Sequence, residues 1–423
     1  MRGLRARLTV SVVAIIAGVV PATAPAFAAE TGGCADTARP LTVEEQRLAG
    51  AVPQEILRRS GFDSAAPRFA HALCGARSYR QAEQVITTHG QHLWQRAVDR
   101  AQGRGAPDGD LSRDDDRPLY WARLGLTGAL RQWRPAFGLT DAGRAALLDR
   151  LERGSRGQDA IRFPAGKGVR RVLVTGFDPF TLDRDIRISN PSGATALALD
   201  GTTVRTDAGP VRIETAVFPV RWGDFANGTV ERALRPHLPQ ADLFTTVSQG
   251  RPGRFDVERF NGAWRGGFPD NENLSSTGLV PVSDPASQPQ WTVTTLPYQK
   301  IVAAPTGRFP VYDNTQVTEI PAGATTPVVR PDGPTEGSTA RSGSGGDYLS
   351  NEIAYRATLL RDRLHLRIPG GHVHTPVLQF APGNTDPATG TITDAEFVRN
   401  RLDIIAQART IILVAAGTTP PRT

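Results

Sequence analysis

The sequence predicts an α/β fold, a three-layer α/β/α sandwich built on a mixed sheet, preceded by a mostly helical N-terminal domain. Three observations lead to this prediction. Residues 35–155 carry apolar side chains at helical spacing. From Arg170 onward, short apolar strand patterns alternate with helical patterns, an order typical of layered α/β domains. The chain of 423 residues is also long enough for two or three domains with sizeable cores.

The first residues have the features of a secretory signal peptide. A start with three arginines precedes an apolar run from Leu8 to Val20, and the small residues Ala26 to Ala28 match a cleavage site. We expect residues 1–28 to be removed and the remaining chain to be secreted and extracellular. The apolar run is too short for a membrane span, and no later stretch is apolar enough for one. We therefore expect no membrane partner.

The charge pattern argues against nucleic-acid binding. The formal net charge of +7 includes the three arginines of the signal segment. The other basic residues are almost all arginines, and they are scattered among acidic residues rather than massed in one patch. A nucleic-acid interface needs such a patch, so none is expected.

The two cysteines, Cys34 and Cys74, indicate a disulfide. An even pair in an exported chain usually forms a bridge, because the exterior is oxidising. The alternative is two buried free thiols. Neither cysteine is near the candidate site in sequence.

Residues 29–165 form the predicted helical domain. The residues Thr42 to Glu45 look like a helix start, and further helical patterns cover 79–101, 120–133 and 140–153. Nothing in this domain has a spacing that indicates chemistry.

Residues 166–417 form the predicted α/β domain. Strands are expected at 171–176, 213–220, 243–247 and 410–415, and helices at 355–364 and 395–408. Residues 305–346 are rich in Pro, Gly, Thr and Ser and indicate a long, partly mobile surface excursion. The tail, residues 418–423, is expected to be disordered.

Four short segments carry the candidate chemistry. They are Gly176–Phe180, Val257–Arg259, Gly346–Asn351 and Gly371–Pro376. In this order they resemble the pyroglutamyl peptidase I family, also called pyrrolidone-carboxylate peptidases, which are cysteine peptidases. The resemblance spans roughly residues 170–415 and leaves out the helical domain.

The resemblance implies a catalytic role for three residues. Ser350 stands where the family has its nucleophilic cysteine, His374 matches the general base, and Glu258 matches the residue that orients the histidine. The implied activity is removal of N-terminal pyroglutamate from peptides, with no cofactor and no metal.

The resemblance also implies a substrate slot. Phe177 and Phe180 match aromatic residues that stack on the flat lactam of pyroglutamate. Arg251 is the preferred match to the family's arginine, and Arg254 competes for the same position. The slot departs from the family at Thr181 and Leu182, where two glycines are usual.

Each candidate residue also has an ordinary interpretation. Serine is a preferred helix N-cap, Glu258 could form a surface salt bridge, and the two phenylalanines could be core residues. His372 and His374 lie on one strand face, but no third metal ligand has convincing spacing.

Three functions therefore remain open from the sequence. The chain is a serine-based pyroglutamyl peptidase, a hydrolase with another substrate, or a catalytically inactive relative that binds a peptide or a protein. Retention of Glu258 and His374 favours a hydrolase. The sequence leaves the oligomeric state undetermined.

Overall fold

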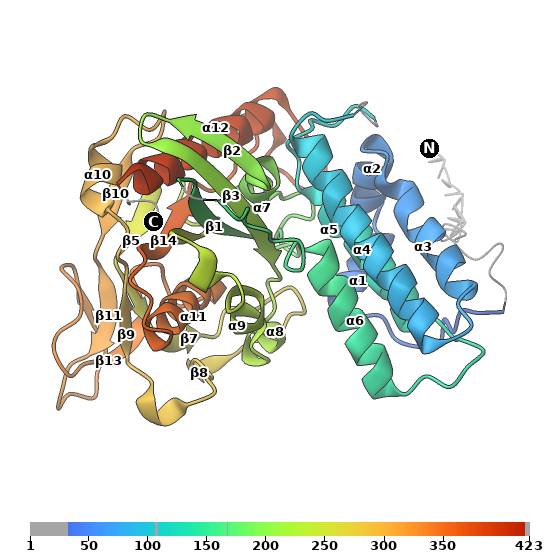
Figure 1. The fold of residues 1–423 in the computed structure, drawn as a ribbon, viewed down its shortest axis with the longest axis horizontal. Helices are drawn as coiled ribbons and strands as arrows, with labels where there is room; N and C mark the ends of the chain where they lie inside the picture. Colours follow the sequence, from blue (N-terminus) through green and yellow to red (C-terminus); the bar gives the residue numbers. More distant parts are fainter. Residues whose placement is uncertain (1–32, 106–108, 167, 419–423) are drawn as a thin grey trace, which may run out of the picture.

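A computed structural model of the chain describes residues 33–105, 109–166 and 168–418 (Figure 1). The predicted signal peptide, residues 1–28, and the tail residues 419–423 lie outside this part. A helical region precedes an α/β region, as the sequence predicts, and the two lie side by side.

The described part of the helical region contains six α-helices: α1 (Val43–Gln46), α2 (Ala51–Arg59), α3 (Ala65–Cys74), α4 (Tyr79–Ala101), α5 (Arg117–Gln132) and α6 (Asp141–Ser155). Local caps fix where several of them begin. Thr42 and Glu45 form a capping box at α1, and the side chains of Ser78 and Thr140 cap α4 and α6. The apolar faces of α2 to α6 share one core.

A disulfide joins Cys34 to Cys74 at the end of α3, with 5.7 Å between the Cα atoms. The disulfide attaches the segment that precedes α1 to α3, and the Asp36 amide attaches it to α5 by donating to the Gln132 carbonyl at 2.6 Å. The N-terminal segment is therefore part of the helical core.

A seven-stranded mixed sheet forms the centre of the α/β region. Its order is β10 (Val311–Asn314), β5 (Phe255–Glu258), β14 (Gly370–Thr375), β4 (Leu243–Gln249), β1 (Arg170–Phe177), β3 (Gly209–Phe218) and β2 (Thr202–Thr206). Strand β1 runs parallel to β3 and β4, β4 parallel to β14, and β5 parallel to β10. The β14–β5 and β2–β3 pairs are antiparallel.

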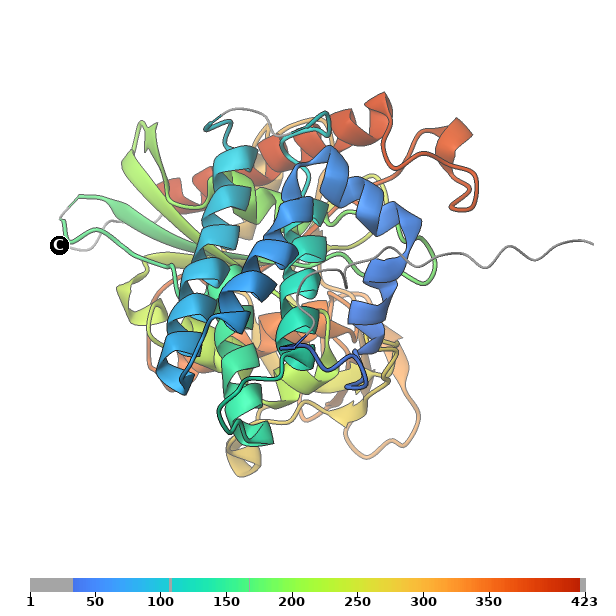
Figure 2. The ribbon, with the colours of Figure 1, turned by 90° about the vertical axis from the view of Figure 1, so that its right-hand side faces the viewer.

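Helices cover both faces of this sheet (Figures 1 and 2). Val172 and Val174 of β1 share a core with α12 (Ala395–Gly417), and α7 (Pro191–Leu199) packs against α12. Leu173, between those valines, shares a core with α8 (Trp222–Ala226), α9 (Thr229–Leu234) and α11 (Leu349–Arg363). Successive strand residues point to opposite faces, so the three-layer prediction is confirmed.

The predicted last strand at residues 410–415 is wrong. These residues continue α12 to Gly417, and Ala408, Ile411, Ile412 and Ala415 are buried at helical spacing. A short continuous apolar run gives no periodicity of its own, so the sequence alone did not separate strand from helix.

Residues 305–346 are more structured than their composition indicates. Strand β10 joins the edge of the main sheet, while β11 (Val317–Ile320), β12 (Val328–Arg330) and β13 (Thr339–Ser342) form a small antiparallel sheet. Two further pairs complete the region: β6 (Phe260–Gly262) with β9 (Trp291–Val293), and β7 (Trp264–Gly266) with β8 (Thr277–Leu279). The remaining α-helix, α10 (Tyr298–Ala303), packs near α12 and β10.

None of the described helices combines the length and the apolarity needed to span a membrane.

Candidate active site

The antiparallel pairing of β5 and β14 brings Glu258 and His374 together. Glu258 is the last residue of β5, and His374 lies near the end of β14. Their side chains are buried, and Nδ1 of His374 lies 2.7 Å from Oε1 of Glu258. An ionised carboxylate only accepts hydrogen bonds, so the neutral histidine carries its proton on Nδ1. Its Nε2 has no hydrogen-bond partner among the described residues and can accept a proton.

Asn314 holds the other oxygen of Glu258. Its Nδ2 donates to Oε2 of Glu258 at 2.8 Å and to the Ser344 carbonyl at 2.7 Å. Asn314 ends β10, so the excursion of residues 305–346 supplies a direct partner of the candidate acid. The composition of that excursion gave no signal for this role.

Ser350 lies in the first turn of α11. Its Oγ donates to the Gly345 carbonyl at 3.3 Å. Gly345 is packed against His374, because a Cβ atom added at Gly345 would lie 3.1 Å from Cε1 of the ring. Ser350 and His374 therefore both contact Gly345. The first amides of α11 have no intrahelical partners, and the positive end of the helix dipole favours negative charge there.

Gly250 lies against the Cβ and Cγ atoms of His374. A Cβ atom at this position would lie 2.6 Å from Cβ of His374, closer than side chains pack. The Gly250 amide also donates to the Thr375 carbonyl at 2.9 Å. Two glycines, Gly250 and Gly345, thus fix the histidine between close backbone segments.

Aromatic side chains surround a small cavity next to Ser350. Its volume is about 30 Å³, and it is lined by Phe177, Phe180, Asn190, Val220, Ser248, Gln249, Tyr348, Leu349 and Ser350. The rings of Phe180 and Tyr348 lie 6.2 Å apart, and the Tyr348 hydroxyl donates to the Pro269 carbonyl at 3.0 Å. This volume holds about one or two waters, which is less space than a five-membered lactam occupies.

Arg251 and Arg254 do not line this cavity. Both pair with the buried Asp256 at 3.1 Å, and the Arg251 side chain is 47% exposed. The structure therefore places the two candidate arginines in one ion-pair cluster around Asp256, the β5 residue that pairs with His374 of β14.

His372 is a buried structural histidine in this arrangement. Its Nδ1 lies 2.7 Å from the Thr246 hydroxyl and its Nε2 lies 2.8 Å from the Ser248 hydroxyl. Burial, with a smaller effect of His374, lowers the pKa of His372 well below its usual range. Both ring nitrogens are engaged, and the described residues contain no group of three or more His, Cys, Asp or Glu placed to hold a metal.

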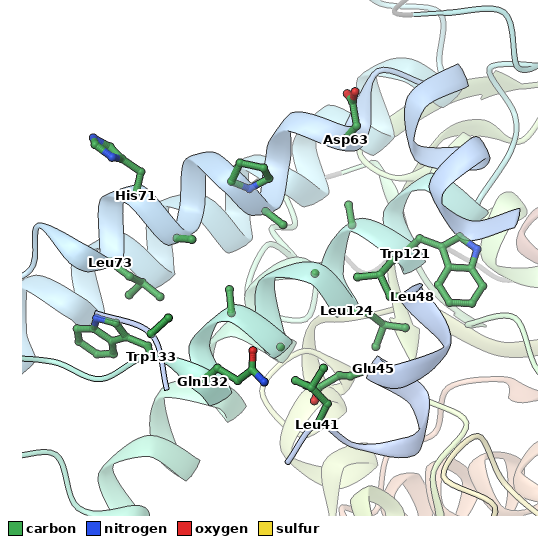
Figure 3. Close-up of a pocket in the computed structure, with 18 of the residues that line it drawn as sticks. Leu41, Glu45, Leu48, Asp63, His71, Leu73, Trp121, Leu124, Gln132 and Trp133 are labelled. Atoms are coloured by element: carbon green, nitrogen blue, oxygen red, sulfur yellow. The ribbon is translucent and has the colours of Figure 1, made fainter. Parts of the chain in front are cut away.

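A second, larger cavity lies in the helical region (Figure 3). It has a volume of about 750 Å³ and lies mainly between α3 and α5, with the Cys34–Cys74 disulfide in its wall. Most of its lining is apolar, and Figure 3 shows Leu73 and Trp133 together and Leu48 near Trp121. Neither Ser350, His374 nor Glu258 contributes to it.

Comparison with known proteins places both regions in one family. The PA0049 N-terminal domain family matches residues 24–152, and the PA0049 C-terminal domain family matches residues 171–280 and 308–379. Uncharacterized protein PA0049 from Pseudomonas aeruginosa is 34% identical over an alignment of 490 positions, which covers 88% of this chain and 88% of that protein. The chain belongs to the PA0049 family.

The second PA0049 match contains all the candidate residues. Glu258 lies in its first part, and Asn314, Ser350 and His374 lie in its second part. The interval between the first and second PA0049 matches, residues 153–170, begins in the last turn of α6 and ends at the first residue of β1.

The α/β region is also similar to solved structures. A mutant pyrrolidone carboxyl peptidase from the hyperthermophile Pyrococcus furiosus matches 58% of this chain and 97% of its own, with 22% identity and a TM-score of 0.40. Pyroglutamyl peptidase I from Bacillus amyloliquefaciens matches 58% of this chain and 95% of its own, with 20% identity and a TM-score of 0.40.

Proposed function

We propose that the protein is a hydrolase that removes N-terminal pyroglutamate from peptides, with Ser350 as the nucleophile, His374 as the general base and Glu258 as its orienting acid. The 2.7 Å contact between His374 and Glu258 carries this proposal, together with the absence of a hydrogen-bond partner for Nε2 of the histidine among the described residues. The sequence motifs around these residues support the substrate class.

In the proposed reaction, Oγ of Ser350 attacks the carbonyl carbon of the pyroglutamyl residue while its proton passes to Nε2 of His374. Amides in the first turn of α11 stabilise the oxyanion of the tetrahedral intermediate. His374 then gives the proton to the departing amine, which leaves a pyroglutamyl ester on Ser350. Water, deprotonated by His374, hydrolyses that ester and restores the serine.

An inactive, peptide-binding protein is the second candidate. Two observations favour it: the Ser350 hydroxyl donates to the Gly345 carbonyl, and the neighbouring cavity is only about 30 Å³. A hydroxyl is also a far weaker acid than a thiol, so the reaction depends on close alignment with the base.

Release of a fluorescent amine from a pyroglutamyl amide tests the proposal. The wild type, Ser350→Ala and Ser350→Cys are compared, with Ser287→Ala, an exposed serine in another segment, as a control. Loss of activity by about 100-fold or more in Ser350→Ala, with Ser287→Ala unchanged, supports the serine mechanism. An inactive wild type beside an active Ser350→Cys supports the binding role instead. Full activity in Ser350→Ala would remove Ser350 from the mechanism.

Export is a separate part of the proposal. The N-terminal sequence pattern supports it, and so does the Cys34–Cys74 disulfide, because disulfides persist mainly in oxidising compartments. Sequencing the N-terminus of the protein recovered from the culture medium tests it. A mature chain that begins near residue 29 is expected, and retention of the intact chain in the cytoplasm would contradict it.

A further inference from the structure

The segment from Asp178 to Asn190 connects β1 to α7 and is called the slot loop here. It contains Phe180, and Phe180 and Asn190 line the small cavity beside Ser350. The slot loop is attached to the helical region at several points along its length. These attachments indicate a role for a region in which the sequence shows no catalytic motif.

An apolar anchor lies near the start of the slot loop. Leu182 is buried in the core formed by the helices of the N-terminal region, and Ile186 and Ile188 pack against the same core. Thr181, the residue directly before Leu182, has a backbone φ of 60°, a conformation that favours glycine. Leu182 therefore inserts into the helical region at the position where a glycine is usual in the family that the motifs resemble.

A buried ion cluster holds the first residue of the slot loop. Both carboxylate oxygens of Asp178 accept hydrogen bonds, one from Arg123 of α5 and the other from Arg156 at the end of α6. Nε of Arg156 also donates to Glu152 of α6 at 2.8 Å. All four side chains are largely buried, so removing one partner leaves a charge without compensation.

Further contacts hold the middle and the end of the slot loop. Arg47 forms a bidentate ion pair with Asp183, at 2.8 and 2.9 Å. At the other end, Asp116 accepts hydrogen bonds from the Ser189 hydroxyl and, at 3.0 Å, from the Asn190 amide.

Asn271 connects the slot loop to α1. Its Nδ2 donates to the Pro179 carbonyl at 2.9 Å and to Oε1 of Glu44 at 3.0 Å. The Tyr120 hydroxyl of α5 donates to the same Glu44 oxygen at 2.8 Å. The Pro179 carbonyl, next to Phe180, is thus linked through the Asn271 side chain to Glu44 of α1 and, through Glu44, to Tyr120 of α5.

We propose that the helical region is a built-in clamp that positions the slot loop, with Leu182 and Asp178 as its main positioning residues. The clamp sets where Phe180 lies in the wall of the cavity that Ser350 also lines. Its effect on substrate binding rests on the proposed function, whereas its effect on the slot loop itself does not.

Hydrogen exchange of the full-length mature protein tests the clamp directly. Leu182→Ala is expected to accelerate exchange in residues 177–190 by about tenfold or more, without a comparable change in β14. Leu147→Ala is the matched control, because Leu147 is also a buried leucine of the same core but lies outside the slot loop. Leu182→Met, which keeps most of the volume, is expected to restore slow exchange. Equal acceleration in the two alanine variants would overturn the proposal.

A polar variant covers the case in which Leu182→Ala does not fold. Asp178→Asn is compared with Glu83→Gln, which breaks a half-exposed ion pair with Arg150 in the same helical region. Selective acceleration in the slot loop of Asp178→Asn supports the clamp, and an exchange pattern like that of Glu83→Gln contradicts it.

Kinetics separate the clamp from the proposed function. With a pyroglutamyl amide as substrate, Leu182→Ala is expected to raise KM about fivefold or more with a smaller change in kcat, and Leu182→Met to reverse this. If the wild type shows no turnover but the exchange results hold, the clamp stands and the proposed reaction fails. If turnover is present and neither KM nor loop exchange responds to Leu182→Ala, the clamp fails alone.

Discussion

Individual side chains around His374 determine which chemistry is available. Glu258 accepts from Nδ1 of the histidine, and Asn314 donates to the second oxygen of Glu258. The carboxylate is buried, so each of these hydrogen bonds replaces water that the site excludes. Asn314 therefore belongs with the predicted residues, although it was not recognised in the sequence.

Replacement of Asn314 tests this role. In Asn314→Ala, Oε2 of Glu258 loses its donor, so we expect a fall in kcat/KM of about tenfold or more and a loss of about 1–3 kcal/mol of stability. Amide release and urea unfolding measure the two effects. Asn400→Ala, at a partly exposed position of α12, is the control. Unchanged kinetics in Asn314→Ala would show that the contact has no part in catalysis.

The buried His372 predicts a pH dependence of stability. Its pKa is lowered in the folded state, so below the ordinary histidine pKa of about 6.5 the unfolded chain binds more protons than the native protein does. The contribution of neutral His372 to the free energy of unfolding is therefore present in full above that pH. It is lost as the pH falls, by up to about 2 kcal/mol between pH 6.5 and pH 5. Urea unfolding at pH 7.5 and 5.0 measures it. A His372→Gln variant should show a smaller difference between the two pH values, and an equal difference would contradict the assignment.

At the scale of elements, the site depends on strands that are not neighbours in sequence. Strand β14 lies between β4 and β5, and β10 lies beyond β5 at the sheet edge. This order places Glu258, His374 and Asn314 on three adjacent strands. Close backbone packing at Gly250 and Gly345 then holds the histidine ring.

Gly250→Ala tests the packing between these elements. The added Cβ atom would lie 2.6 Å from Cβ of His374, so β14 or the turn after β4 must shift. We expect a loss of about 1–3 kcal/mol of stability and a large loss of activity. In Gly223→Ala the new Cβ atom meets no other atom within 4 Å, so this helical variant should be as stable as the wild type or slightly more stable. Thermal unfolding and amide release compare the two, and equal behaviour would contradict the packing argument.

At the scale of the whole molecule, the helical and α/β regions meet along the slot loop and its partners. Charged side chains from both sides are largely buried there, including Glu44, Glu152 and Arg156 from the helical region and Asp178 from the slot loop. Such clusters fix relative position well, because any displacement leaves a buried charge without its partner.

Removal of the Cys34–Cys74 disulfide tests how much the helical region contributes to the stability of the protein and of the slot loop. The bridge closes a loop with a sequence separation of 40 residues, so the chain-entropy model gives a loss of about 4 kcal/mol on its removal. A Cys34→Ser/Cys74→Ser variant is expected to unfold at lower temperature and to exchange faster in the slot loop. The wild type with and without a reducing agent, followed by thermal unfolding, provides the comparison. An unchanged midpoint would mean that the bridge contributes little.

The sequence by itself determined the order of the two regions, the α/β class, the longer helices, three strands of the main sheet, and the residues Glu258, Ser350 and His374 as candidates. These features are encoded locally, in hydrophobic periodicity, caps and short motifs. Only the tertiary structure decided that Asn314 joins the site, that Leu182 enters the helical core, and that residues 410–415 continue α12. Each of these depends on which distant segments pack together, and local sequence does not contain that information.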